Sequence, residues 1–186
     1  MKKTYEMNIA GLDRALPLCP LNDSLQIGAF VIFGDPELTT ACAKELNARA
    51  PEYDYAITAE SKGIPLLHEM SRLDGNRRYF LARKKPKLYM KDVFEVTVRS
   101  ITTEGEQKLY LDGADAELMR GKRILIVDDV ISTGESLSAL EQLVNAVGGI
   151  ICGKMCILAE GAAADRSDII YLERLPLFDK DGEPIA

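Results

Sequence analysis

The sequence predicts an α/β fold in which helices flank both faces of a mainly parallel sheet. Segments of strand length alternate with segments of helical periodicity between residues 28 and 173. The segment "RILIVDD", residues 123–129, is almost continuously apolar, as expected of a strand that is buried on both faces. With 47% hydrophobic and 28% charged residues in 186 positions, the composition is typical of a single globular domain, residues 1–186.

The first half of the chain predicts strands and helices in alternation. The first helix has the clearest start, because Asp35 can cap it and Pro36 suits its first position. A later helix is expected to end at Gly75. In chain order the expected elements are an extended segment at 28–34, a helix at 35–50, a strand at 53–60, a helix at 63–75 and a strand at 77–85.

The second half begins with a segment that breaks this alternation. Within residues 86–112, "FEVTVRSI" and "QKLYL" alternate in polarity, and "TTEGE" supplies a turn between them, so we expect a β-hairpin. After it come a strand at 123–129, an amphipathic helix at 135–149 that ends at two glycines, and strands at 150–160 and 168–173.

Composition argues against several classes of protein. A net charge of −6 and a pI near 5.0 argue against a general nucleic-acid-binding protein. We expect no membrane span, because no apolar run approaches about 20 residues, and no secretory signal, because "MKKTYEMNIAG" lacks an apolar core. The four cysteines form no recognisable disulfide or metal pattern, so a cytoplasmic protein is expected. The only histidine, His68, is interpreted as a packing or surface residue.

The most informative segment is "ILIVDDVISTGES", residues 124–136. Its carboxylates, Asp128 and Asp129, follow a buried strand, and ligands of parallel sheets bind beyond the carboxyl ends of the strands. The turn behind them leads into a helix, so its backbone N–H groups, hydroxyls and glycine suit a phosphate. Carboxylates beside such a site are suited to neutral hydroxyls or a metal ion. A diol next to a phosphate is a ribose 5-phosphate.

Three other interpretations of this segment are possible from its residues. Solvated acids before a capped helix would need no ligand at all. A response-regulator receiver domain also has a strand like "ILIVDD", but only 57 residues (186 − 129) follow Asp129, too few for four further strands at about 30 residues per βαβ unit. A Walker A loop would need a lysine after the glycine, and "STGES" has none.

The run "VDDVISTGES" resembles the phosphoribosyl pyrophosphate motif of the type I phosphoribosyltransferases. The likeness covers roughly residues 25–160 and is closest to the adenine and xanthine enzymes, which share the "ARK" segment, the hairpin and the strand–helix–strand after it. It implies a type I phosphoribosyltransferase fold with a small N-terminal hood, residues 1–34, and a flexible hairpin lid, residues 86–112. It also implies Mg²⁺ as cofactor, phosphoribosyl pyrophosphate and a purine base as substrates, and a homodimer.

The resemblance also assigns roles to individual residues. Asp128 and Asp129 would hold the ribose hydroxyls, with Mg²⁺ held mainly by the substrate. Glu104, or Glu106 beside it, would reach the site from the lid. The remaining assignments are Ser132, Thr133, Gly134, Glu135 and Ser136 for the 5′-phosphate; Ser61, Lys62, Gly63, Arg83, Lys84, Lys85 and Lys87 for the pyrophosphate; and Leu25, Ile27 and Glu160 for the base.

The nature of the base depends mainly on Glu160. An ionised carboxylate only accepts hydrogen bonds, so it suits an exocyclic amine or ring N–H and favours adenine. A xanthine-type or other-base enzyme is the alternative. A second alternative is a regulator that senses phosphoribosyl pyrophosphate without turnover, as purine repressors with this fold do. About 25 residues precede the first expected strand, too few for the DNA-binding domain of such a regulator.

Overall fold

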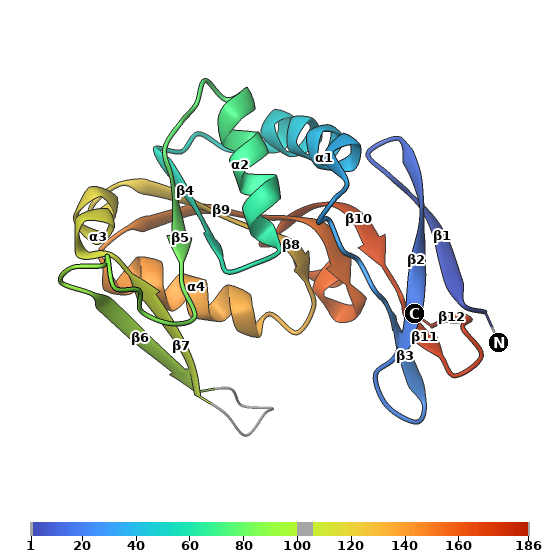
Figure 1. The fold of residues 1–186 in the computed structure, drawn as a ribbon. Helices are drawn as coiled ribbons and strands as arrows, with labels where there is room; N and C mark the ends of the chain where they lie inside the picture. Colours follow the sequence, from blue (N-terminus) through green and yellow to red (C-terminus); the bar gives the residue numbers. More distant parts are fainter. Residues whose placement is uncertain (1, 100–105, 186) are drawn as a thin grey trace.

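A computed structural model describes residues 2–99 and 106–185. Its centre is a five-stranded parallel sheet in the order β10-β9-β8-β4-β5 (Figure 1). The strands are β4 (Tyr55–Ala59), β5 (Tyr79–Ala82), β8 (Arg123–Ile131), β9 (Ile150–Glu160) and β10 (Ile170–Leu175). The mainly parallel sheet predicted from the sequence is therefore confirmed.

Helices cover both faces of this sheet, as predicted (Figure 1). α1 (Pro36–Arg49) and α2 (Gly63–Leu73) pack on the face to which β8 turns Leu125 and Val127. α3 (Gly113–Met119) and α4 (Glu135–Ala146) pack on the other face, against Ile124 and Ile126. This alternation along β8 explains its continuous apolar sequence, because successive side chains enter two different cores.

The first helix begins as its sequence predicts. The Asp35 carboxylate caps α1 by accepting a hydrogen bond from the backbone N–H of Leu38 at 3.0 Å, and Pro36 occupies the first turn. Arg14 donates hydrogen bonds from two of its nitrogens to the same carboxylate, which lowers the pKa of Asp35. The cap is therefore ionised at neutral pH and tied to a strand near the N-terminus.

A second sheet joins the two ends of the chain (Figure 1). Its order is β1-β2-β3-β11-β12, and all of its pairings are antiparallel. The strands are β1 (Thr4–Ile9), β2 (Leu12–Pro20), β3 (Leu25–Gly28), β11 (Leu177–Asp179) and β12 (Pro184–Ile185). The sequence interpretation missed this sheet apart from its third strand, and it wrongly placed the first strand of the chain at residue 28.

The predicted hairpin is present as β6 (Phe94–Arg99) and β7 (Glu106–Leu111), which pair antiparallel beside the α3–α4 face. Its predicted tip lies outside the described residues. β7 also contacts the segment after β5: the backbone N–H groups of Arg83 and Tyr110 each donate to the other residue's carbonyl at 2.8 Å. The base of the hairpin is thereby joined to the edge of the central sheet.

Several predicted boundaries were wrong. The strand expected at 28–34 is β3, which ends at Gly28, and residues 29–34 form no strand. β8 runs on to Ile131, so Asp128 and Asp129 lie inside the strand and pairing continues past them to β9. Helix α3, capped by Asp112, was not predicted. None of the described helices is long and apolar enough to cross a membrane.

Candidate active site

A cavity of about 490 Å³ lies where the carboxyl ends of β4, β8 and β9 face the end of β3. It is open to solvent and is bounded by segments that are far apart in the sequence. Its lining residues are 27–31, 59–62, Lys84, 128–130, Ser132, Ser136 and Glu160. The structure thus brings the acid pair, the turn behind it, two lysines and Glu160 to one place.

The acid pair is the most buried charged feature of this cavity. Asp129 is only 3% exposed, and the Asp128 carboxylate accepts a hydrogen bond from the backbone N–H of Asp129 at 2.9 Å. Burial, reinforced by the charge of Asp129, raises the pKa of Asp128 well above its ordinary value. Two carboxylates held this way are poorly solvated, so hydrogen bonds donated by the hydroxyl groups of a ligand would stabilise them.

Lys62 supplies the counter-charge to Asp129. The Lys62 ammonium lies 2.7 Å from Asp129 Oδ2 and 3.4 Å from the Phe30 carbonyl oxygen, to which it donates. Within the described residues, Asp129 Oδ2 is buried and has no hydrogen bond of acceptable geometry besides this ion pair. Lys62 was assigned to the pyrophosphate by resemblance; here its side chain joins the acid pair to the segment that follows β3.

The turn after β8 surrounds a smaller cavity of about 50 Å³, lined by Asp128 and residues 130–137. Gly134 adopts a left-handed conformation, with φ of +82°, and is the N-cap of α4. Its carbonyl accepts the first helical hydrogen bond, from Ser138, at 2.8 Å. Ser132, Thr133 and Ser136 line this cavity at the N-terminus of α4, a set of residues suited to an anion.

The loop between β4 and α2 contains the predicted pyrophosphate residues, and Ser61 and Lys62 line the main cavity. The peptide bond between Glu60 and Ser61 is cis. Gly63 is not a lining residue, but it is essential to the packing: a Cβ there would lie 2.2 Å from Thr58 Oγ1 and 3.3 Å from Asp128 Oδ1. Only glycine lets this loop lie so close to the acid pair.

The basic segment after β5 is held by a residue that the sequence interpretation did not single out. Glu60 Oε1 lies 3.0 Å from Arg83 NH2, and Glu60 Oε2 accepts a hydrogen bond from the backbone N–H of Lys84 at 2.9 Å. Of the four basic residues predicted here, Lys84 lines the cavity, whereas Arg83, Lys85 and Lys87 do not. An acid directly before a predicted anion loop was the signal for Glu60.

The predicted base-binding residues divide in the same way. Ile27 and Glu160 line the cavity, and Leu25 does not, because it lies two residues further from the cavity along β3 and pairs with Asp179. Burial raises the pKa of Glu160, and the nearby Lys62 opposes this shift. Phe30, 5% exposed, is a further cavity residue that sequence reasoning did not identify.

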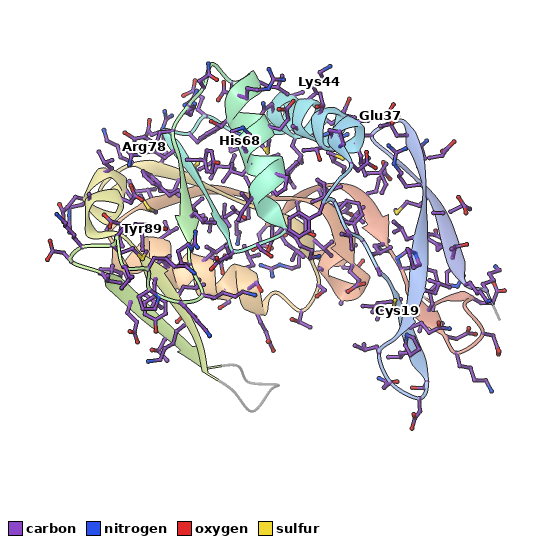
Figure 2. The ribbon with its side chains drawn as sticks, in the orientation of Figure 1. Cys19, Glu37, Lys44, His68, Arg78 and Tyr89 are labelled. Carbon is purple, nitrogen blue, oxygen red and sulfur yellow. The ribbon has the colours of Figure 1, made fainter. Side chains whose placement is uncertain are left out.

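The structure does not describe the two glutamates predicted to reach the site, and it places the only histidine outside the cavity lining. Glu104 lies outside the described residues, and although Glu106 begins β7, its side chain is outside the described part as well. His68 is exposed on the outer side of α2, where its Nδ1 lies 3.2 Å from the Tyr79 hydroxyl (Figure 2). This position agrees with the interpretation of His68 as a surface residue.

The donors present suit a shared metal ion and not a protein-only metal site. Residues 2–99 and 106–185 contain no group of three or more histidine, cysteine, aspartate or glutamate side chains that could hold an ion. Mg²⁺ commonly keeps several waters and binds through one or two carboxylates together with substrate phosphates. A buried carboxylate pair with an incompletely partnered oxygen fits such a role for Asp128 and Asp129.

Comparison with known proteins gives a consistent result. Residues 41–176 match the family model described as a phosphoribosyl transferase domain. A hypoxanthine/guanine phosphoribosyltransferase of Methanotorris igneus is 34% identical over 67% of this chain, and the match spans 63% of that relative. A xanthine phosphoribosyltransferase of an Exiguobacterium species is 30% identical over 79% of this chain and 80% of its own length.

Solved structures show the same fold. An adenine phosphoribosyltransferase from Thermoanaerobacter pseudethanolicus superposes with a TM-score of 0.69 at 19% identity, covering 86% of this chain and 95% of that one. Another, from Rhodothermus marinus, gives a TM-score of 0.66 at 20% identity over 86% and 94% of the two chains.

Proposed function

Because this chain belongs to the type I phosphoribosyltransferase family, we propose that it transfers a ribose 5-phosphate group from phosphoribosyl pyrophosphate to a purine base. The observation that carries the proposal is the single cavity in which a buried acid pair, a hydroxyl-rich turn at a helix N-terminus and a lysine-bearing loop meet. Each part suits a different group of the same substrate.

The reaction exchanges one bond at C1 of the ribose for another. The bond between C1 and the pyrophosphate oxygen breaks, a bond from C1 to a purine ring nitrogen forms, and the nitrogen releases its proton. In the proposal Asp128 and Asp129 accept hydrogen bonds from the ribose hydroxyls, and residues 132–136 bind the 5′-phosphate. These contacts fix C1 between base and leaving group, so catalysis is mostly positioning and charge stabilisation.

The pyrophosphate would leave on the side of residues 61–63 and Lys84. Asp128 and Asp129 would hold Mg²⁺, which would neutralise part of the charge of the diphosphate. The β6–β7 hairpin is proposed to be the lid that keeps water away from the electron-poor C1, and Glu104 or Glu106 is proposed to reach the site from it. β1–β3 are proposed to form the hood over the base, together with the C-terminal strands beside them.

We propose adenine as the base. Glu160 lines the cavity from the end of β9, and as a carboxylate it can accept from the exocyclic amine of adenine. Ile27, which also lines the cavity, is proposed to supply apolar contact to the base. The alternative is an oxopurine, which is supported by the names of the sequence relatives. Burial raises the pKa of Glu160, and a protonated acid could donate to a purine oxygen instead.

Two further features belong to the proposal. We propose a homodimer, because apolar side chains are exposed next to the cavity and the basic segment, at Val31, Phe33, Leu88 and Tyr89. Tyr89 projects from the segment between β5 and the hairpin (Figure 2). Light scattering during size-exclusion chromatography would test the dimer, and a monomer at micromolar concentration would contradict it. We also propose a cytoplasmic location, as expected for salvage of free bases.

The deciding experiment is pyrophosphate release by the purified protein with phosphoribosyl pyrophosphate and Mg²⁺. Adenine, hypoxanthine, guanine, xanthine, uracil and orotate are tested separately. Release with adenine alone supports the enzyme and the role of Glu160, whereas release with an oxopurine keeps the enzyme and rejects that role. Tight binding of phosphoribosyl pyrophosphate without release for any base would indicate a sensor. A folded Asp128→Asn/Asp129→Asn variant that keeps its activity would reject the site.

A further inference from the structure

The small cavity behind the acid pair lacks a basic side chain in its described lining. That lining includes the acidic residues Asp128 and Glu135. A phosphate monoester carries a charge of about −1.5 to −2 at neutral pH. The N-terminus of a helix offers only roughly half a positive charge, and hydroxyl groups add none. A cation close to the turn, though outside the cavity lining, would therefore strengthen phosphate binding.

Arg166 is placed to be that cation. It follows the short helix η1 (Gly161–Asp165) in the connection from β9 to β10. A Cβ built on Gly134 would lie 2.9 Å from Arg166 NH1, closer than side chains tolerate, so the guanidinium rests directly against the turn. Gly134 is also the residue whose left-handed conformation begins α4. The conformation favours glycine at this position, and a Cβ added there would have to displace the end of the Arg166 side chain.

A chain of charged contacts fixes the orientation of Arg166. Its Nε and NH2 atoms donate to the two carboxylate oxygens of Asp168 at 2.9 and 2.8 Å. Asp168 also pairs with Lys154 of β9, and Lys154 Nζ lies 2.6 Å from Glu141 Oε1 on α4. The Lys154 side chain is only 15% exposed, so water screens this network incompletely. Helix α4, which begins at the turn, is therefore connected to Arg166 through Lys154 of β9 and Asp168.

Asp168, the anchor of Arg166, binds two of the three guanidinium nitrogens and leaves the third beside the turn. Among the described residues NH1 of Arg166 has no hydrogen-bond acceptor, and NH1 is the atom next to Gly134. Arg166 and Lys154 hold the pKa of Asp168 well below its usual range, so the anchor is ionised throughout the physiological range. A bidentate arginine–carboxylate pair has a fixed geometry that a lysine would not reproduce.

We propose that Arg166 is a positioning residue for the 5′-phosphate of the substrate. It holds the Gly134 turn in its phosphate-binding conformation and adds positive charge behind it, while Asp168, Lys154 and Glu141 keep it in place. This inference rests on the proposed function, because the ligand is the phosphate of a phosphoribosyl group.

The test compares Arg166→Gln, Arg166→Lys and a matched control, Arg174→Gln. Arg174 lies on β10 and pairs with Asp165 at the surface, so its substitution changes the charge equally without touching the turn. Binding of ribose 5-phosphate to the full chain is measured by calorimetry, alongside steady-state kinetics. We expect Arg166→Gln to weaken ribose 5-phosphate binding and raise the KM for phosphoribosyl pyrophosphate about tenfold, the usual effect of one charged interaction.

The other constants distinguish positioning from a general structural role. For Arg166→Gln we expect kcat and the KM for the base to change less than twofold; Arg166→Lys should regain part of the loss, and Arg174→Gln should match wild type. Wild-type binding by Arg166→Gln, or an equal loss in Arg174→Gln, would overturn the inference. Ribose 5-phosphate binding by wild type without turnover would reject the proposed function and leave the inference testable. Absence of both ribose 5-phosphate binding and turnover in wild type would reject both.

Discussion

At the scale of single residues, the buried acid pair has a cost to stability that falls mainly on Asp128. Asp129 has Lys62 as a partner at 2.7 Å, whereas Asp128 accepts one backbone hydrogen bond and has no cation within ion-pair distance among the described residues. The raised pKa of Asp128 means that the folded protein keeps a proton which the unfolded chain has already released. Stability therefore falls as pH rises between the unfolded and folded pKa values of this group.

Replacing Asp128 by asparagine tests this balance. Asparagine keeps the shape and can still accept from the N–H of Asp129, but it removes the buried charge. We expect the ligand-free variant to be more stable than wild type by about 1–3 kcal/mol at pH 8, with little difference at pH 4, where Asp128 is protonated in the folded protein. Urea unfolding at the two pH values measures this difference.

The same substitution is expected to lower kcat/KM for phosphoribosyl pyrophosphate about 10- to 100-fold, because a neutral amide is a weaker acceptor for the ribose hydroxyls. Leu143→Ala, on the buried face of α4, is the control. It lowers stability by removing buried volume without touching the cavity, so it shows whether a change of stability alone alters kcat/KM. If the Asp128→Asn variant is less stable than wild type at pH 8, the charge of Asp128 must be well compensated in the folded protein.

Sequence reasoning succeeds at this scale where chemistry is local. Asp128, Asp129 and the turn to Ser136 are contiguous, so their proximity needs no tertiary information. Arg166 could not be found this way, because "DRSD" reads as an ordinary charged surface run and its neighbour Gly134 is 32 residues away (166 − 134). Leu25 was predicted to bind the base by comparison with the family. The sequence does not specify where its strand ends, and so it could not show which residues of that strand reach the cavity.

At the scale of elements, the loop after β4, the basic segment after β5 and the hairpin form one connected unit. Glu60 binds Arg83 and the N–H of Lys84, and Arg83 shares two backbone hydrogen bonds with Tyr110 of β7. Movement of the hairpin would therefore be transmitted to the loop that follows β4. Arg83 Nε is buried without a hydrogen-bond partner in the described structure, so the position of this side chain depends mainly on its ion pair with Glu60.

Glu60→Gln is expected to loosen this unit. Glutamine can satisfy the N–H of Lys84, but it loses the charge that holds Arg83. We expect the KM for phosphoribosyl pyrophosphate and the inhibition constant of pyrophosphate to rise about tenfold, since charged hydrogen bonds contribute about 1.5–3 kcal/mol. The inhibition constant of the nucleoside monophosphate product, which lacks the diphosphate, should stay within twofold. Product-inhibition kinetics give all three values.

Glu117→Gln provides the control, because Glu117 pairs with Arg120 at 2.9 Å on the exposed surface of α3, where an ion pair contributes little. A lower KM for phosphoribosyl pyrophosphate in Glu60→Gln would mean that the charge of Glu60 repels the diphosphate, and the positioning role would then be rejected.

Element prediction from sequence was good wherever one rule dominated. Capping at Asp35 predicted α1 to within one residue at each end, and the apolar face of residues 135–149 predicted the start of α4 but placed its end three residues too late. The end of β8 was misplaced because two acids look like a strand terminus, whereas pairing with β9 carries the backbone on to Ile131. α3 was missed because it has only seven residues, too short for a periodic pattern.

At the scale of the whole molecule, the cavity depends on both ends of the chain. β3, which supplies Ile27 and Gly28 to the lining, pairs with β2 on one side and with β11 on the other. Gln26 is buried and donates to the carbonyls of Asp179 and Lys180 at 3.0 Å. Sequence reasoning treated the first 34 residues as a separate hood, because short strands paired across 150 residues leave no local signal.

Phe178 of β11 is the residue through which the C-terminus supports this wall. It is fully buried, its ring centroid lies 4.9 Å from that of Tyr5, and its Cε2 atom lies 3.5 Å from where a Cβ on Gly28 would be. Phe178→Ala should therefore loosen β3 as well as destabilise the fold, by about 3–5 kcal/mol. The acid pair and the turn of residues 132–136 make none of these contacts, although Leu175 of β10 packs against Gly28 from the central sheet.

The kinetic consequence should be selective for one substrate. In Phe178→Ala we expect the KM for the purine base to rise about tenfold or more, the KM for phosphoribosyl pyrophosphate to stay within twofold, and kcat to change little. Kinetics are measured at a temperature where unfolding curves show the variant to be folded. Leu143→Ala, destabilised by a similar amount in the other core, should change neither KM. Equal increases in both KM values would mean that the terminal sheet supports the whole site and has no particular role at its base-binding wall.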